Sequence, residues 1–152
     1  MPTTVRKATL LDLLGFIPLG EAYHKEAQNH GNFPLSLDQT LQNAARAIMC
    51  EDSVILLAFS DGDPAGFIWG GSYALPWSDK KLAMDTLLYV KPEHRGTKVS
   101  FLLMQAWEKW AKESGAVEVQ ISIASGIHED KTCQFYQRLG YHHTGTQYRK
   151  EI

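Results

Sequence analysis

The segment Lys91–Ser100 contains the residue types that bind anions. It joins an expected strand at residues 82–90 to an expected helix that follows Gly96. A helix that starts directly after a turn leaves backbone N–H groups unpaired, and its dipole favours negative charge there. Arg95 adds a forked cation, and Gly96 lets the backbone come close to a ligand. The segment therefore indicates a diphosphate site, with a plain surface turn as the alternative.

The elements before this segment must place its strand in a sheet. Residues 5–9 predict a first strand, and a helix is expected to begin after Asp12 and to break at Pro18. A second helical stretch should end near Gly31, and a further helix should start at Ser36. Three strands then follow as an antiparallel meander, at residues 54–59, 65–70 and 82–90.

The second half of the chain predicts a parallel strand-helix-strand unit. The helix after Gly96 carries one apolar face, and residues 117–123 alternate as a strand does. A strand, a helix and a strand in this order imply a parallel pair joined by a right-handed crossover. A last helix is expected at 130–139, followed by one or two closing strands within 141–151. The fold class is therefore α/β with a mixed sheet, in one domain spanning residues 1–152.

Two motifs in this half resemble those of the GNAT (GCN-related N-acetyltransferase) superfamily. Val90–Gly96 is similar to the family's V-x-P-x-x-R-G strand end, and Arg95–Ser100 to its Arg/Gln-x-x-Gly-x-Gly/Ala loop. Lys98 stands where that loop usually has Gly, and Ser100 where it has Gly or Ala. Phe135–Tyr141 is similar to the family's late aromatic motif.

The resemblance implies a GNAT fold with splayed central strands and a coenzyme cleft between them. It implies that the chain is an acetyl-CoA-dependent N-acetyltransferase that acts on a primary amine, in a small molecule or a protein, by direct attack in a ternary complex. The backbone of residues 88–90 would pair with the pantetheine arm, and the loop would bind the diphosphate. The coenzyme-binding residues implied in this way are Leu88, Tyr89, Val90, Arg95, Gly96, Thr97, Lys98, Val99 and Ser100.

Two residues are the candidates for the proton transfers of such a reaction. Tyr136 would protonate the departing thiolate, as the resemblance implies, or else be a core aromatic. Asp85 is the only carboxylate on the motif strand and is our candidate general base. Glu21 and Glu26 are substitutes for it, a water chain could also serve, and a solvated edge carboxylate is the structural alternative for Asp85.

Composition bounds the remaining partners. The net charge of −2 attracts no nucleic acid, and no stretch is long and apolar enough to span a bilayer. The N-terminus shows no secretory pattern, so a cytoplasmic protein is expected, with Cys50 and Cys133 reduced. The scattered histidines predict no metal site.

Several questions stay open at the level of the sequence. A catalytically inactive GNAT-like binding domain and a structural or interaction protein are the competing classes. The fold is also compatible with a homodimer through the C-terminal strands, which the sequence itself does not indicate. The acceptor is undefined, although aromatic residues gather in the segments that would shape its site, namely Tyr23, Phe33, Trp69, Tyr73 and Trp77.

Overall fold

The computed structural model describes residues 2–152, so Met1 of the expected domain lies outside the described part. Five strands form a sheet in the order β1-β2-β3-β4-β5. β1 to β4 pair antiparallel, and β5 runs parallel to β4. The expected meander followed by a parallel crossover is therefore confirmed. The strands are β1 (Thr3–Lys7), β2 (Ser53–Ser60), β3 (Asp63–Ala74), β4 (Lys81–Val90) and β5 (Ala116–Gln120).

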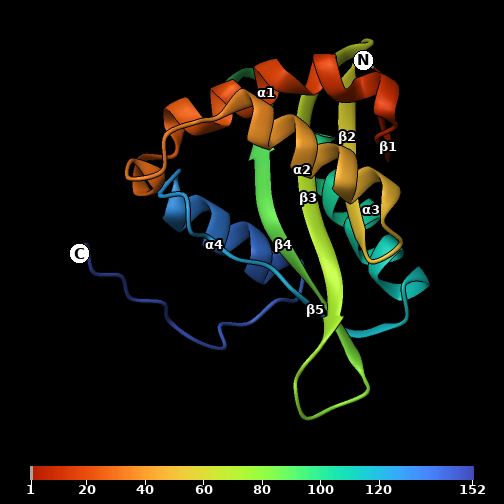
Figure 1. Ribbon diagram of the computed structural model, residues 1–152, viewed down its shortest axis with the longest axis vertical. Helices are drawn as coiled ribbons and strands as arrows, with labels where there is room; N and C mark the ends of the chain where they lie inside the picture. The colour runs from red at the N-terminus through yellow and green to blue at the C-terminus, as the bar shows by residue number, and fades with distance from the viewer. Residues whose placement is uncertain (1) are drawn as a thin grey trace.

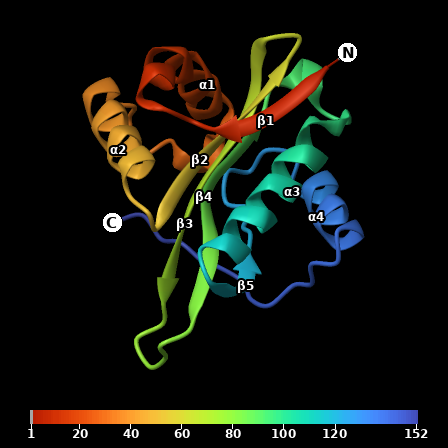
Figure 2. The ribbon, with the colours of Figure 1, turned by 90° about the vertical axis from the view of Figure 1, so that its right-hand side faces the viewer.

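Helices cover both faces of this sheet. α1 and α2 lie against one face, and α3 and α4 lie on the other (Figures 1 and 2). Short 3-10 turns stand before and after α1 and before α3. The helices are α1 (Leu13–Glu26), α2 (Leu37–Met49), α3 (Lys98–Glu113) and α4 (Glu129–Arg138), and the turns are η1 (Leu10–Asp12), η2 (Gln28–His30) and η3 (Pro92–His94).

The two helical layers explain the continuous apolar run of β2. Successive side chains of a strand point to opposite faces, so a strand covered on both sides needs apolar residues throughout. Val54 and Leu56 belong to the core under α3, whereas Ile55 and Leu57 belong to the core under α1 and α2. β2 is therefore an inner strand of the sheet, and its side chains pack in two separate apolar cores, one on each face.

The crossover helix α3 begins and ends as its sequence indicates. The Thr97 side chain caps its N-terminus by accepting from the Val99 amide at 3.3 Å. Gly115 follows its last turn with a φ of +87°, in the left-handed region that glycine adopts without steric cost. Its inner face buries a set of large apolar residues: Val99, Leu103, Met104, Trp107, Trp110 and Ala111.

The expected break of the first helix at Pro18 is wrong. α1 continues through Pro18 to Glu26. A proline removes one backbone donor, that to the carbonyl four residues earlier, which here belongs to Leu14. Pro18 and Leu14 are both exposed, and the buried side of α1 is formed instead by Phe16 and Leu19. The missing bond therefore falls on the outer side of the helix, and packing of the inner side keeps the helix intact.

The closing strands expected within 141–151 are not present in the described structure. Residues 142–152 form an exposed, extended segment that leaves the end of α4 and runs outside the sheet (Figure 1). Tyr148 is 90% exposed, and an Arg149 side chain donates to the Asn29 carbonyl. After Tyr141 this segment is almost wholly polar, so pairing along β5 would bury little apolar surface.

Candidate active site

β4 and β5 separate halfway along β4. Their parallel pairing runs from Lys81 with Ala116 to Met84 with Gln120, and it stops there although β4 continues to Val90. On its other side β4 stays paired with β3 along its whole length. Beyond Met84, then, the side of β4 that faces away from β3 has no partner strand among residues 2–152. The expected splay of the central strands is confirmed.

A bulge in β4 coincides with the point of separation. Gly70 of β3 lies opposite Asp85, while the preceding Trp69 lies opposite Leu87, so Thr86 is an extra residue in β4. A bulge of this kind bends a strand and changes the direction of its side chains. It explains why β4 turns away from β5 directly after Asp85.

Asp85 lies at this point and is buried, with 7% of its surface exposed. Its Oδ1 accepts from the amide of Ser122 at 2.9 Å and from the Ser122 hydroxyl at 3.2 Å. Burial raises the pKa of Asp85 to about 6, although the bonds from Ser122 oppose the rise. The structure thus contradicts the alternative of a solvated edge carboxylate, and it places Asp85 between the separated strands with a pKa near neutrality.

Tyr136 of α4 also lies at the point where β4 and β5 separate, because it contacts the same residue, Ser122, as Asp85 does. Its side chain is buried, and its hydroxyl donates to the carbonyl of Ser122 at 3.4 Å. Burial raises the pKa of Tyr136 far above its usual range, and the nearby Asp85 raises it further. The two predicted catalytic residues, 51 positions apart in the sequence, therefore both contact Ser122.

Ser122 is a site residue that sequence reasoning missed. The pattern of residues 117–123 predicts a strand to 123, yet β5 ends at Gln120. The Ser122 amide donates to the Asp85 side chain, so it serves the carboxylate instead of a strand ladder. Alternation alone could not identify it, because the contact depends on where β4 leaves β5.

The turn before α3 has the geometry of an anion site. Gly96 has a φ of +74°, and no atom lies within 4 Å of where a Cβ would stand, so the backbone there is open to a ligand. Within residues 2–152, the amides of Lys98 and Ser100 donate to no backbone or side-chain acceptor outside their own helix. Lys98 is the first residue of α3, is exposed, and has no positive φ, so the departure from the Gly pattern leaves the backbone unstrained. These features fit a diphosphate at the N-terminus of α3.

The guanidinium of Arg95 is held by α1 and β4. Its Nε donates to the Val90 carbonyl at 2.9 Å, and its Nη2 donates to both carboxylate oxygens of Glu26 at 2.8 and 2.9 Å. The group also lies 5.6 Å from the centre of the Tyr89 ring, whose hydroxyl donates to Glu26 at 2.8 Å. Although burial opposes it, these bonds lower the pKa of Glu26, so this substitute for the general base is a weaker base than Asp85.

The remaining coenzyme candidates line the upper half of β4. Leu88, Tyr89 and Val90 pair with Ile68, Phe67 and Gly66 of β3 along one side of the strand. Tyr89 points into the core under α1, whereas Leu88 and Val90 pack on the α3 side. Their backbone is therefore fixed in position by two cores and by β3, next to the side that no strand covers.

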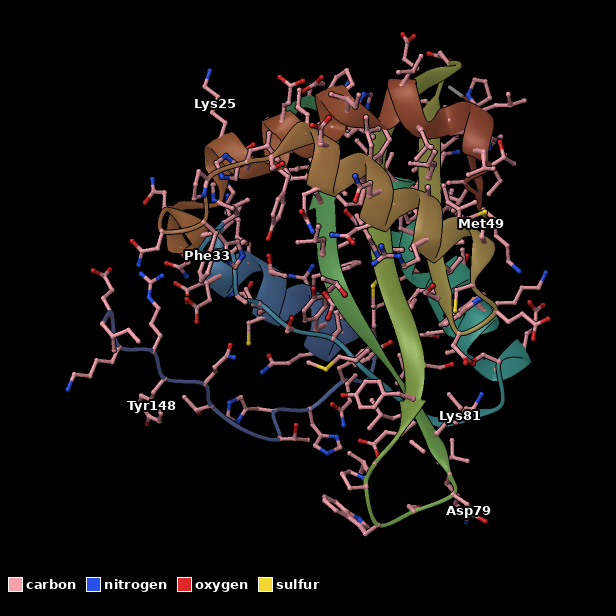
Figure 3. All side chains as sticks on the ribbon, in the orientation of Figure 1. Lys25, Phe33, Met49, Asp79, Lys81 and Tyr148 are labelled. Carbon is pink, nitrogen blue, oxygen red and sulfur yellow. The ribbon has the colours of Figure 1, made fainter. Side chains whose placement is uncertain are left out.

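The aromatic residues expected near the acceptor do not form one group. Tyr23 is buried and bonded to His30 at 3.0 Å, and Trp69 packs against Phe16. Phe33 is 71% exposed beside the α1–α2 connection, and the hairpin between β3 and β4 carries Trp77, 80% exposed, far from it (Figures 1 and 3). The structure therefore gives the acceptor no single aromatic pocket.

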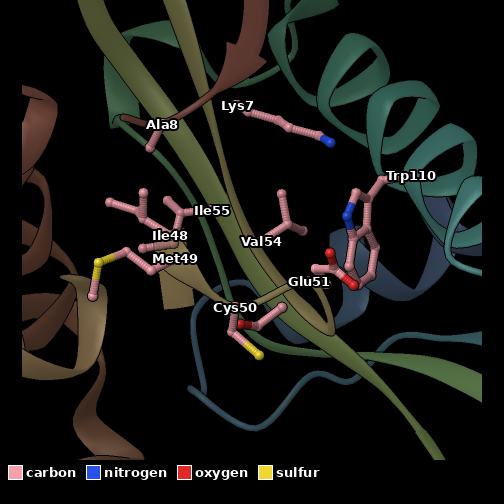
Figure 4. Close-up of a pocket in the computed structure, with 10 residues that line it drawn as sticks. Lys7, Ala8, Ile48, Met49, Cys50, Glu51, Val54, Ile55 and Trp110 are labelled. Carbon is pink, nitrogen blue, oxygen red and sulfur yellow. The ribbon is translucent and has the colours of Figure 1, made fainter. Parts of the chain in front are cut away.

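Two hollows on the surface lie away from Asp85, Tyr136 and the turn before α3. One of about 240 Å³ lies between the end of β1 and the C-terminal end of α2, with Lys7, Met49 and Trp110 around it (Figure 4). None of the predicted site residues lines it. Among residues 2–152, no group of three or more His, Cys, Asp or Glu side chains is arranged to hold a metal ion. None of the described helices has the length and apolar character that crossing a membrane requires.

Comparisons with known proteins agree with this geometry. Residues 16–141 match the sequence model described as the Acetyltransferase (GNAT) family. No curated protein matches the chain significantly.

Solved structures with the same fold include several acetyltransferases. A ribosomal-protein-alanine N-acetyltransferase from Brucella melitensis biovar Abortus 2308 superposes with a TM-score of 0.76 at 18% identity, over 99% of each chain. The aminoglycoside N-acetyltransferase AAC(6′)-Iy in complex with CoA gives 0.78 at 17% identity, over 99% of this chain and 96% of its own. AAC(6′)-Ih from Acinetobacter baumannii gives 0.74 at 20% identity, over 99% of each chain. Identities this low establish a shared fold.

Proposed function

The chain belongs to the acetyltransferase (GNAT) family, and on this premise we propose that it transfers an acetyl group from acetyl-CoA to a primary amine in a ternary complex. The observation that carries the proposal is the pair Asp85 and Tyr136, which both contact Ser122 where β4 and β5 separate. A buried carboxylate with a pKa of about 6 and a protonated phenol supply the base and the acid that the reaction needs.

The coenzyme would lie along the uncovered side of β4. The backbone of residues 88–90 would bind the pantetheine arm, and an amide there would polarise the thioester carbonyl. The diphosphate would lie at the N-terminus of α3, where Gly96 gives access and the amides of Lys98 and Ser100 are directed to it. The amides of Thr97 and Val99 donate instead to the His94 carbonyl and the Thr97 hydroxyl. The exposed ammonium of Lys98 adds a positive charge at this point.

The proton transfers divide between the two catalytic candidates. Asp85 takes a proton from the acceptor ammonium, which frees the nitrogen lone pair to form a bond with the acetyl carbon. The bond between that carbon and sulfur breaks, and the electron pair leaves on sulfur. Tyr136 donates its phenolic proton to the thiolate, and the second proton that the nitrogen loses as the amide forms restores the phenol. Burial raises the pKa of Tyr136, which keeps the phenol protonated before the attack and also makes it a weaker acid than a free tyrosine.

The acceptor class is drawn from the related structures. Two of these enzymes are named for aminoglycosides and one for a ribosomal-protein alanine. All of these acceptors present a primary amine, and the buried carboxylate of Asp85 supports an acceptor that must lose a proton before it attacks. A small-molecule amine and a protein N-terminus are therefore the two classes to test first.

A turnover assay tests the proposal. The protein is incubated with acetyl-CoA and a panel containing an aminoglycoside, a polyamine and an alanine-initiated peptide, while the released CoA thiol is measured. We expect release that requires one class of amine and that falls strongly in Asp85→Asn. Binding of acetyl-CoA without release for any amine would instead favour the catalytically inactive GNAT-like domain.

We also propose that residues 1–152 form a single domain, that the protein is cytoplasmic, and that it forms a homodimer. Light scattering at several protein concentrations measures the last of them directly.

A further inference from the structure

The side chain of Arg95 and the helix it precedes lie on opposite faces of the sheet. The guanidinium lies over Tyr89, whose ring packs in the core under α1 against Tyr23 at 5.9 Å. α3 covers the other face, where Val90 and Val99 belong to its core. The cation of Arg95 is thus directed away from α3, while the backbone of the same turn leads into the α3 N-terminus.

The guanidinium of Arg95 is bonded to both β4 and α1. Nε closes the turn by bonding the carbonyl of Val90, five residues earlier, at 2.9 Å. Nη2 donates to both carboxylate oxygens of Glu26, which is the last residue of α1. Glu26 is in turn oriented by the Tyr89 hydroxyl at 2.8 Å. The turn from Lys91 to Gly96 is therefore tied at one side chain to both α1 and β4.

We propose that Glu26 is a positioning residue for the coenzyme: by holding Arg95, it fixes the Lys91–Gly96 turn so that the Lys98 and Ser100 amides face the diphosphate. The inference rests on the proposed function, because it needs acetyl-CoA to bind at α3. In this inference the Arg95 side chain connects the turn to α1 and β4, and it does not bind the phosphates directly.

The contacts favour a tie for a physical reason. Two donors of the planar guanidinium are bonded to different elements, Nη2 to Glu26 of α1 and Nε to the Val90 carbonyl of β4, and together they fix its plane. The side chains of Arg95 and Glu26 are 26% and 31% exposed, so solvent screens their attraction and the pair adds little to global stability. Its effect is then local, on the conformation of a turn that contains Gly96 with a positive φ.

The test compares two acetyl donors. Acetyl-CoA carries the diphosphate, whereas S-acetylpantetheine carries only the arm that would bind along β4. kcat/KM is measured with each donor, and the acetyl-CoA dissociation constant by calorimetry, for Glu26→Ala, Glu26→Gln and Glu113→Ala. Glu113→Ala is the matched control, because it removes an exposed ion pair with Lys109 on the far end of α3.

We expect Glu26→Ala to weaken acetyl-CoA about tenfold and to lower kcat/KM for acetyl-CoA by a much larger factor than kcat/KM for S-acetylpantetheine. Glu26→Gln should lose less, because its amide oxygen still accepts from Arg95. Glu113→Ala should match the natural protein. If Glu26→Ala fails to fold, Glu26→Gln alone decides, with a larger loss for acetyl-CoA than for S-acetylpantetheine as the expected result.

Three results would overturn the inference. Tighter acetyl-CoA binding in Glu26→Ala would mean that Glu26 competes with the diphosphate for Arg95. An equal loss with both donors would assign Glu26 to overall stability or to the acceptor side, and no change would remove it from the site. Failure of the natural protein to bind acetyl-CoA is a distinct result, since it would contradict the proposed function itself.

Discussion

Asp85 occupies a position that costs the folded protein stability. Burial raises the pKa of its carboxyl to about 6 in the folded state, against 3.8 for a free aspartate side chain, so the folded state binds the proton more tightly. Between about pH 4 and 6 stability then falls as the pH rises, and the full cost is present above pH 6. A buried charge kept at such a cost is typical of a functional group.

Replacing this carboxylate should therefore stabilise the protein. Asp85→Asn keeps an oxygen that accepts from Ser122 and removes the buried charge, so we expect a gain of about 1–3 kcal/mol at pH 7. Chemical denaturation at pH 7 and at pH 5 checks this, and the gain should be smaller at pH 5, where the natural side chain is largely protonated. If Asp85→Asn were less stable than the natural protein at pH 7, the inference that Asp85 is buried as a charged carboxylate would be wrong.

The same pKa sets the expected pH dependence of catalysis. A general base works only when it is deprotonated, so kcat/KM should fall as the pH drops through about 6. The inflection should disappear from the residual activity of Asp85→Asn. A profile of the natural enzyme that stays flat down to pH 5 would assign the base to another group or to water.

Tyr136 should act on turnover and hardly on coenzyme binding. Tyr136→Phe removes only the hydroxyl that donates to Ser122, so we expect a fall in kcat of at least about tenfold with little change in acetyl-CoA affinity. Tyr141→Phe is the control, because that hydroxyl donates to Glu108 at 2.9 Å. Equal kcat values for the natural enzyme and Tyr136→Phe would make Tyr136 a packing residue.

At this scale the sequence predicts what is local. Asp85 is a candidate because it is the only carboxylate on the strand before the motif, and Tyr136 because it lies in the late aromatic motif. The turn is a candidate anion site because Gly96 and the helix after it are consecutive. The partners of these residues are not local: Glu26 meets Arg95 across 69 positions, and Ser122 meets Asp85 across 37. Such contacts depend on the placement of strands and helices, which no spacing pattern in one sequence contains.

Among the elements, the turn before α3 makes the sharpest prediction. Gly96 has a left-handed φ of +74° in open space, so Gly96→Ala should strain the turn by about 1–2 kcal/mol and weaken acetyl-CoA binding. Gly15→Ala is the matched control, since Gly15 lies in α1 with nothing within 4 Å of a Cβ and should gain about 0.5–1 kcal/mol. Calorimetry and thermal unfolding measure the two effects. Unchanged coenzyme affinity in Gly96→Ala would remove this turn from the site.

Most of the elements follow from periodicity and end residues. Ser36 and Thr97 cap helices as such residues do, and Gly115 and Gly140 end them with positive φ. The expected helix break at Pro18 was wrong because the general effect of proline on a helix also depends on which side of the helix is buried. The bulge at Thr86 could not be read from the sequence either, since it appears only when β3 and β4 are paired.

The whole molecule is a sheet covered by helices on two faces, and the proposed site draws residues from both faces. α3 and α4 bring the diphosphate turn and Tyr136 to one side, and α1 approaches the end of β4 from the other (Figure 2). β4 and β5 separate because β5 pairs with only the first half of β4, and the proposed coenzyme site lies along this separation. The closing strands were predicted wrongly because a polar segment gains little from covering β5, and that gain depends on the complete sheet.

We expect acetyl-CoA to bind along β4 where this strand separates from β5, and thermal unfolding with and without the coenzyme measures this binding. Acetyl-CoA at about 100 times its dissociation constant should stabilise the protein by about 2.7 kcal/mol. For a chain of this size that is a rise in Tm of roughly 5–10 °C, with no rise for adenosine at the same concentration. No shift at saturating acetyl-CoA would contradict the account and would withdraw the roles given to Asp85 and Tyr136.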